Sequence, residues 1–176
     1  MTHLNRRALA IGAAALSTFP AKSDVSPWST VVLQADALEQ CRAIIVLLRG
    51  ETVVSKVFRG PGLERAAPIK SVSKTIVAAL TGIAIDRGEI SSPQQTLANT
   101  APRLIPKGAD PRVAKITIEH LLTMQAGLER TSGANYGGWV QSADWVANAL
   151  MRPFVAEPGS RMLYSTGSFH VLGAVL

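Results

Sequence analysis

Two β-branched runs separated by a glycine turn constrain the fold of this chain more than any other feature. Residues 43–48 read AIIVLL, residues 52–59 read TVVSKVFR, and Gly50-Glu51 lies between them. Because β-branched residues favour strands and a short glycine-containing connection favours antiparallel pairing, the pattern predicts a β-hairpin. The first run is apolar throughout, so we expect it to be buried on both faces of a sheet.

The residues around this hairpin predict a mostly helical remainder. From residue 72 to residue 84, apolar side chains recur at helical spacing, which predicts a long, largely buried helix with Gly88 as its C-cap. The patterns predict further helices at residues 36–41, 117–127 (opened by Thr117), 142–150 and from about 166 onward. Residues 91–111 are expected to form a loop with one helical turn, and residues 131–138 a glycine-rich loop.

Composition places the chain among single-domain globular proteins. With 176 residues, of which 47% are hydrophobic, it can bury one core but is short for two domains. The net charge of +6, from 18 Lys and Arg against 12 Asp and Glu, is spread along the chain without a basic run. This excess favours anionic small molecules or an anionic cell envelope as partners and argues against nucleic acid. The single cysteine, Cys41, excludes an internal disulfide and a CxxC site.

Residues 1–21 have the pattern of an export signal. Arg6 and Arg7 precede an uncharged stretch, ALAIGAAALSTFPA, which suits a signal-peptide core and is shorter than the roughly 20 residues of a spanning helix. We therefore expect an exported protein, periplasmic or secreted, cleaved after Ser17 or Ala21, with no stable membrane span after signal removal. The paired arginines resemble the twin-arginine export motif, so twin-arginine export and general secretion both stay open, as does a disordered N-terminal arm.

Ser71 and Lys74 are the first candidate catalytic residues. Their spacing places both side chains on one face of a helix that starts near Ser71, where free backbone amides favour an oxyanion. A lysine that loses its proton in a dry pocket can accept the hydroxyl proton of Ser71 and make it a nucleophile. The spacing alone also fits a serine that caps the helix beside a solvated lysine. Tyr164, which lies before the last helix, can share a proton with Lys74 or protonate a leaving group.

Three segments resemble, in the same order, those of beta-lactamase-related serine hydrolases: SVSKTIVAALTGIAIDRGEI, ITIEHLLTMQAGL and EPGSRMLYSTGSFHVLGAVL. The most similar branch contains class C beta-lactamases, D-alanyl-D-alanine carboxypeptidases, esterases and 6-aminohexanoate-oligomer hydrolases. The resemblance extends from about residue 43 to the last residue, Leu176. It implies an α+β, penicillin-binding-protein-like (serine transpeptidase-like) fold with an antiparallel sheet and a helical region. Residues 22–176 would then form a partial domain of this family.

The resemblance implies a role for each motif residue. The S-x-x-K motif of the family gives Ser71 as the acylated nucleophile, with its backbone amide as half of an oxyanion hole, and Lys74 as the proton acceptor. The tyrosine of the family's Y-x-N motif falls on Tyr164. Thr166 stands where that motif has asparagine, and we expect it to bind substrate with a shorter reach. The implied substrate is an ester, an amide, a beta-lactam or a D-amino-acid peptide, and neither a metal nor an organic cofactor is implied.

Two expectations limit this functional prediction. The chain ends before the K-T-G or H-x-G strand that supplies the second oxyanion amide in this family, so we expect a domain truncated at its C-terminus and impaired in activity. A different class of function also stays open, a non-catalytic fragment that binds cell-wall peptide or a partner. His120 and His170 are expected to be core residues, because no G-x-S-x-G motif accompanies them. The oligomeric state is left open.

Overall fold

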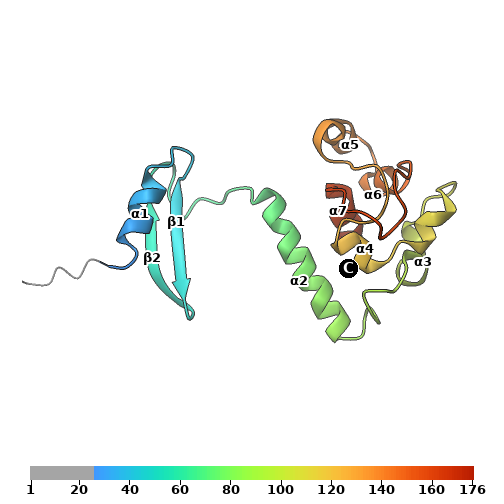
Figure 1. Cartoon of the computed structure of the whole chain (residues 1–176), viewed down its shortest axis with the longest axis horizontal. Coiled ribbons are helices and arrows are strands. Elements are labelled where there is room, and N and C mark those ends of the chain that lie inside the picture. The colour runs from blue at the N-terminus through green and yellow to red at the C-terminus, as the bar shows by residue number, and fades with distance from the viewer. Residues whose placement is uncertain (1–25) are drawn as a thin grey trace, which may run out of the picture. The chain divides into compact units, whose positions relative to one another are not determined.

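The computed structural model describes residues 26–176, so the predicted export signal at residues 1–21 lies outside the described residues. The chain divides into two compact units, Met1–Ala67 and Pro68–Leu176. Figure 1 shows a helix and a hairpin in the first unit and a group of helices in the second. None of the helices that the structure describes is long and apolar enough to cross a membrane.

The predicted hairpin is confirmed in the first unit. Strand β1 (Ala43–Leu48) pairs antiparallel with strand β2 (Glu51–Val57), and the register shifts by a bulge at Val46/Leu47. Arg49 and Gly50 form the turn with φ values of 53° and 86°. Positive φ at both positions is the geometry of a type I′ turn, which matches the twist of antiparallel strands. The turn therefore lies one residue earlier than expected, at Arg49-Gly50.

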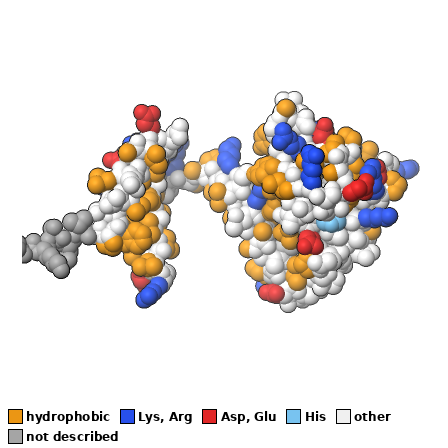
Figure 2. All heavy atoms as spheres, in the orientation of Figure 1, with side chains coloured by type: hydrophobic (Ala, Val, Ile, Leu, Met, Phe, Trp, Pro, Cys, Tyr) orange, Lys and Arg blue, Asp and Glu red, His pale blue; other side chains and the backbone are white. Residues whose placement is uncertain are grey.

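The expectation that β1 is buried on both faces is wrong. Ile45 and Leu47 are 50% and 62% exposed. Helix α1 (Ser29–Asp36) is the only other helix or strand that the structure describes in this unit, so no second layer covers both faces of the hairpin. Figure 2 shows hydrophobic side chains at the surface of this unit.

The prediction of a helix at residues 36–41 is also wrong. Helix α1 ends at Asp36, the residue at which the predicted helix would begin. The guanidinium of Arg59 donates hydrogen bonds to the backbone carbonyls of Asp36, Leu38 and Cys41. These contacts satisfy carbonyl groups at the helix end and in the turns that follow it. A single side chain thus ties the end of α1 to the end of the hairpin.

The second unit begins with helix α2 (Ser73–Asp86), which confirms the predicted long helix. Its end is a Schellman motif: Glu89 N donates to Ala84 O (2.9 Å), Gly88 N donates to Ile85 O (2.9 Å), and Gly88 has φ 73°. The expectation that this helix is largely buried is wrong, because Thr81 and Ala84 are its only buried residues. Its large apolar side chains are exposed: Val72 just before it, and Ile76, Leu80 and Ile83 along it.

The core of this unit forms around helix α7 (Thr166–Val175), which confirms the helix predicted from about residue 166. Helices α4 (Ile118–Leu122) and α6 (Trp145–Leu150) pack against α7, and α5 (Tyr136–Val140) packs against α6. Helix α3 (Leu97–Thr100) supplies the helical turn expected in the loop 91–111. The largest fully buried side chains are apolar: Leu97, Ile116, Ile118, Leu121, Leu150 and Leu172.

Two predicted helices are shorter than expected. Thr117 caps α4 as predicted, since its Oγ1 accepts a hydrogen bond from His120 N (3.1 Å), but α4 ends at Leu122 and not near residue 127. Met124 then takes a φ of 55°, which is incompatible with a continuing helix. Helix α6 begins at Trp145 and not at residue 142, because Asp144 Oδ1 accepts the amide hydrogen of Ala147 (2.8 Å). The expected glycine-rich loop at residues 131–138 contains the start of α5.

Gly127 supports the turn that follows α4, and we expect Gly127→Ala to destabilise the unit. Gly127 has φ 81°, and an added Cβ would clash with the backbone carbonyl oxygen of Ala156. Strain at positive φ combined with a backbone clash predicts a loss of about 2–4 kcal/mol of unfolding free energy, or roughly 5 °C or more in Tm. Thermal unfolding followed by circular dichroism measures this loss. Gly137→Ala is the control, because an added Cβ there meets nothing within 4 Å; equal Tm values for the two variants would contradict the account.

Candidate active site

Ser71 and Lys74 lie next to each other at the start of α2. Ser71 is in a 3₁₀ turn (Lys70–Val72) directly before the helix, and Lys74 is the second residue of the helix. Lys74 Nζ donates a hydrogen bond to Ser71 Oγ over 3.1 Å. The serine hydroxyl and the amine are therefore within proton-transfer distance. The expected first-turn arrangement differs in one detail, since Ser71 precedes α2 and does not lie within it.

The backbone just before Ser71 has an uncommon conformation. Lys70 has φ 49°, which a side-chain-bearing residue rarely adopts. The Ser73 hydroxyl donates to the carbonyl oxygen of Lys70 over 2.7 Å and so holds this conformation. The turn presents Ser71 ahead of the helix, and sparsely populated backbone of this kind clusters at functional sites.

Tyr164 reaches the same hydroxyl from a segment 93 residues later in the chain. Its phenol donates a hydrogen bond to Ser71 Oγ over 2.9 Å, and Lys74 Nζ lies 5.4 Å from the centre of its ring. The hydrogen bond with Ser71, together with the nearby Lys74 ammonium, lowers the pKa of Tyr164 below its usual value of 10, although desolvation acts in the opposite direction. The structure thus brings together Ser71, Lys74 and Tyr164.

The start of α7, which follows Tyr164, is held by two hydroxyl side chains from a distant loop. Ser132 Oγ accepts the amide hydrogen of Thr166 (2.9 Å), and Thr131 Oγ1 accepts that of Gly167 (2.8 Å). Buried Ser165 adds a third contact, since its Oγ accepts a hydrogen bond from Thr131 N (3.1 Å). The first two bonds satisfy free amides of the helix N-terminus, and the three together fix the backbone beside Tyr164.

Sequence reasoning missed Thr131 and Ser132, because two hydroxyl residues in a glycine-containing loop have no distinguishing pattern. The structure shows how closely this loop approaches α7 at Gly167, where an added Cβ would lie 2.8 Å from both Thr131 Cγ2 and Ala149 Cβ. Glycine is required where two segments approach this closely. Thr166, the predicted substrate-binding residue, has its own hydroxyl 3.0 Å from Ser132 Oγ and also lines the pocket at Ser71.

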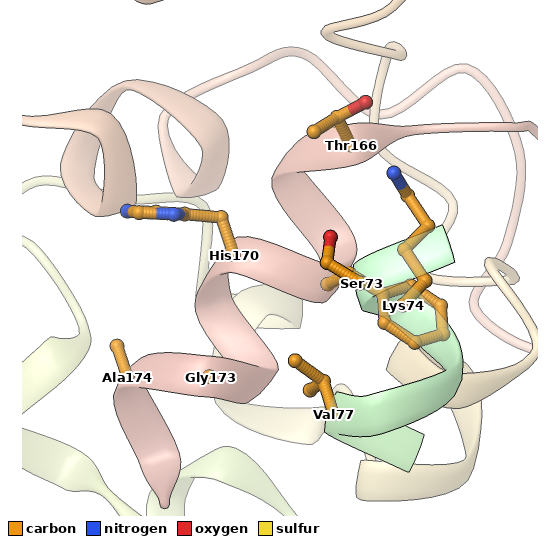
Figure 3. A pocket seen from close by; sticks show the side chains of 8 residues that line it. Ser73, Lys74, Val77, Thr166, His170, Gly173 and Ala174 are labelled. Carbon is orange, nitrogen blue, oxygen red and sulfur yellow. The ribbon is translucent and has the colours of Figure 1, made fainter. Parts of the chain in front are cut away.

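Two adjoining pockets open beside Lys74. The first has a volume of about 390 Å³ and includes Ser71, Lys74 and Thr166, with Lys70 and half-exposed Tyr136 at its rim. The second, of about 400 Å³, lies between α2 and α7 (Figure 3). Ser73, Lys74 and Thr166 line both pockets. Ser71 itself lines the first pocket, and the second begins at its neighbours Ser73 and Lys74.

Neither candidate histidine contacts Ser71. His120 Nδ1 accepts the amide hydrogen of Thr117 (3.3 Å) in the cap of α4. His170 packs edge-on against Trp139 and Trp145, with ring centres 5.6 and 5.2 Å away, and burial lowers its pKa below the usual 6.5. Both histidines are partly buried and engaged in packing or capping. Across residues 26–176, no three His, Cys, Asp or Glu side chains lie close enough together to hold a metal ion.

The family of the chain follows from comparison with known proteins. The sequence profile described as Beta-lactamase matches residues 35–176. The chain belongs to the beta-lactamase family. The expected α+β fold of this family is confirmed by a structural match to the "Putative 6-aminohexanoate-dimer hydrolase from Bacillus anthracis", with a TM-score of 0.59 over 76% of this chain and 18% sequence identity.

That match covers 38% of the Bacillus anthracis protein, so this beta-lactamase-family chain spans well under half of its structural relative. No curated protein shows significant sequence similarity to the chain. Family membership and fold are therefore established, whereas the reaction and its substrate are inferred from the site itself.

Proposed function

We propose that this beta-lactamase-family chain is a serine hydrolase that forms an acyl-enzyme on Ser71. The observation that carries the proposal is the convergence of two proton-transferring groups on one hydroxyl: Lys74 Nζ at 3.1 Å and the Tyr164 phenol at 2.9 Å from Ser71 Oγ. A serine hydroxyl is a weak nucleophile by itself and needs a base within hydrogen-bond distance. A helix-capping serine beside a solvated lysine would not require a tyrosine from a distant segment.

The proposed reaction has two stages. In the first, Lys74 in its neutral form accepts the proton of Ser71, Oγ bonds to the carbonyl carbon of an ester or amide, and the Tyr164 phenol protonates the leaving group as its bond to that carbon breaks. In the second, the Tyr164 phenolate accepts a proton from water as the water oxygen bonds to the acyl carbon, the bond from that carbon to Ser71 Oγ breaks, and the Lys74 ammonium returns its proton to Oγ as the acid is released. Thr166, at the wall of the pocket, is proposed to hydrogen-bond the substrate where family members use asparagine.

A fluorescent fluorophosphonate tests the proposal, since such reagents react with activated serines. We expect the full, folded chain to be labelled with one equivalent of reagent, and a beta-lactam or a p-nitrophenyl ester to compete with labelling. Circular dichroism of the same sample confirms that the chain is folded. A folded chain that takes up no reagent would overturn the proposal and favour the non-catalytic alternative, binding of cell-wall peptide or a partner.

The alkaline limb of the pH profile should reveal the role of Tyr164. Because hydrogen bonding to Ser71 lowers the pKa of Tyr164 below 10, the phenol loses its proton at a lower pH than a free tyrosine. A proton donor must be protonated, so acylation should slow as pH rises through that pKa. We expect Tyr164→Phe to acylate about 10²-fold more slowly and to lack this alkaline decline. An unchanged pH profile in Tyr164→Phe would exclude the assigned role. Tyr136→Phe, which removes the phenol that lines the pocket at Ser71, should keep the alkaline decline whatever its effect on the rate.

The proposal includes export, which rests on the N-terminal sequence alone. We expect the extracellular or periplasmic product from a bacterial host to begin after Ser17 or Ala21. Intact-mass measurement of that product reads the cleavage site. A product that still begins at Met1 would count against the signal peptide.

A further inference from the structure

The groove between α2 and α7 continues away from the catalytic hydroxyl and changes character along its length. At one end lie Lys74 and Thr166, which also line the pocket at Ser71. Farther along, the walls are formed by Val77 of α2 and by Gly173 and Ala174 of α7. Figure 3 shows the Lys74 amine and the Thr166 hydroxyl together at one end, with Val77, Gly173 and Ala174 at the other.

Helical spacing explains why one continuous surface forms. Lys74 and Val77 are three residues apart on α2, and Thr166, His170 and Gly173 follow at intervals of four and three on α7. Residues at these intervals lie on one face of a helix. From Thr166 to Gly173 the rise along α7 is about 10 Å, at 1.5 Å per residue. The groove is thus a channel about two helical turns long that starts at Lys74 and Thr166, both of which also line the pocket that contains Ser71.

The far part of the groove suits an uncharged, unbranched group. Beyond Lys74, His170 is the one ionisable side chain that lines it, and that ring packs against Trp139 and Trp145. Gly173 leaves space in the wall, because an added Cβ there would meet nothing within 4 Å. By contrast, the adjoining pocket carries the Lys70 ammonium and the half-exposed ring of Tyr136. The two pockets that meet at Lys74 and Thr166 therefore have walls of different polarity.

We propose that the α2–α7 groove binds the aliphatic chain of the acyl group that is transferred to Ser71, so that the favoured substrates are esters or amides of unbranched, medium-length carboxylic acids. This inference rests on the proposed function. The polar leaving group occupies the pocket with Lys70 and Tyr136, from which it departs into solvent. The acyl chain stays in the groove while its carbonyl carbon is bonded to Ser71 Oγ. Burial of each methylene group in the groove should then add to the rate of acylation.

The test is a series of p-nitrophenyl esters with acetyl, butyryl and hexanoyl groups, hydrolysed by the full chain. We expect kcat/KM to rise about 10-fold or more from acetate to hexanoate, which is a fraction of the gain for complete burial of four methylenes. A leucine side chain at position 173 would project into the groove, so Gly173→Leu should remove this preference: hexanoate loses about 10-fold, while acetate stays within about twofold of the unmodified chain. Ala174 is the next residue of the same wall, so Ala174→Leu should also lower kcat/KM for the hexanoate more than for the acetate. This second variant keeps the test decisive if Gly173→Leu does not fold.

Gly82→Leu is the matched control, because an added Cβ at this glycine of α2 also meets nothing within 4 Å and Gly82 does not line the groove. Equal losses for acetate and hexanoate in Gly173→Leu, or no dependence on acyl length in the unmodified chain, would overturn the groove assignment while leaving Ser71 as nucleophile. Alkyl acetates with alcohol chains of increasing length test the opposite orientation. A rate that rises with the length of the alcohol but not with the length of the acyl group would assign the groove to the leaving group and overturn the proposal. Loss of all ester hydrolysis, together with no fluorophosphonate labelling of the folded chain, would overturn the proposed function as well.

Discussion

Ser71→Ala is expected to abolish covalent labelling of the chain and to reduce ester hydrolysis by at least about 10⁴-fold. The substitution removes the one oxygen that both Lys74 and Tyr164 contact, so no acyl-enzyme can form. Removal of a catalytic nucleophile characteristically costs about as much as removal of the whole catalytic set, because the remaining groups have nothing to act on. Fluorophosphonate labelling and p-nitrophenyl ester kinetics measure the two effects on the same preparation.

Ser55→Ala is the control for this substitution. Ser55 lies on β2, is exposed, and belongs to the other unit of the chain. It should label and turn over like the unmodified protein. Circular dichroism should show equal folding for both variants, since Ser71 is itself exposed. Residual labelling of Ser71→Ala at the level of the control would refute Ser71 as the nucleophile.

Lys74→Met is expected to slow acylation by about 10³-fold while leaving the chain folded. Methionine keeps most of the length and the apolar stem of lysine but carries neither a charge nor a proton acceptor of suitable basicity. The variant therefore loses the 3.1 Å contact between Nζ and Ser71 Oγ without opening a cavity. Because a base is needed to activate Ser71, the loss should appear in kcat more than in KM.

Lys107→Met is the matched control for Lys74→Met, since Lys107 is exposed and lines neither pocket beside Ser71. We also expect high pH to restore part of the rate to Lys74→Met, because hydroxide can then replace the missing base. A Lys74→Met variant as fast as the control at neutral pH would mean that Lys74 is a solvated surface lysine, as its spacing from Ser71 alone also allows.

Local sequence signals predicted the parts of this fold that local interactions determine. The hairpin follows from two β-branched runs on either side of Gly50, although the turn itself, Arg49-Gly50, lies one residue earlier than predicted. The end of α2 follows from Gly88, and the cap of α4 follows from Thr117. Each of these features depends on residues within about one turn of each other, which is the range over which sequence patterns are informative.

Features that depend on distant partners were not predictable from pattern. The end of α1 depends on Arg59, more than twenty residues later, and the exposure of Ile76 and Leu80 depends on which surfaces cover α2. Apolar spacing predicts that one face of a helix is apolar, but it does not state how much of that face is covered. The same limit applies to the early end of α4, where Met124 takes a left-handed conformation that its sequence does not signal.

The candidate site shows the same division. Ser71 and Lys74 are three residues apart, so their proximity could be predicted from spacing. Tyr164 was a candidate from its place before the last helix, but spacing cannot predict contact over 93 residues, and resemblance to a known family was needed to assign it to the site. Thr131 and Ser132, which hold the start of α7, were missed because their partners lie 34 to 36 residues away. The structure adds what no pattern contained, a tyrosine and a lysine that both hydrogen-bond one serine hydroxyl.

The most direct measurement of the central claim is the identification of the acylated residue by mass spectrometry. The full chain is incubated with p-nitrophenyl hexanoate, quenched in acid within the first turnover, digested and sequenced by fragmentation. The account predicts a hexanoyl group on the oxygen of Ser71, which accumulates more slowly in Lys74→Met. A hexanoyl group on Ser73 or elsewhere, or an unmodified Ser71 in a folded chain that hydrolyses the ester, would contradict it.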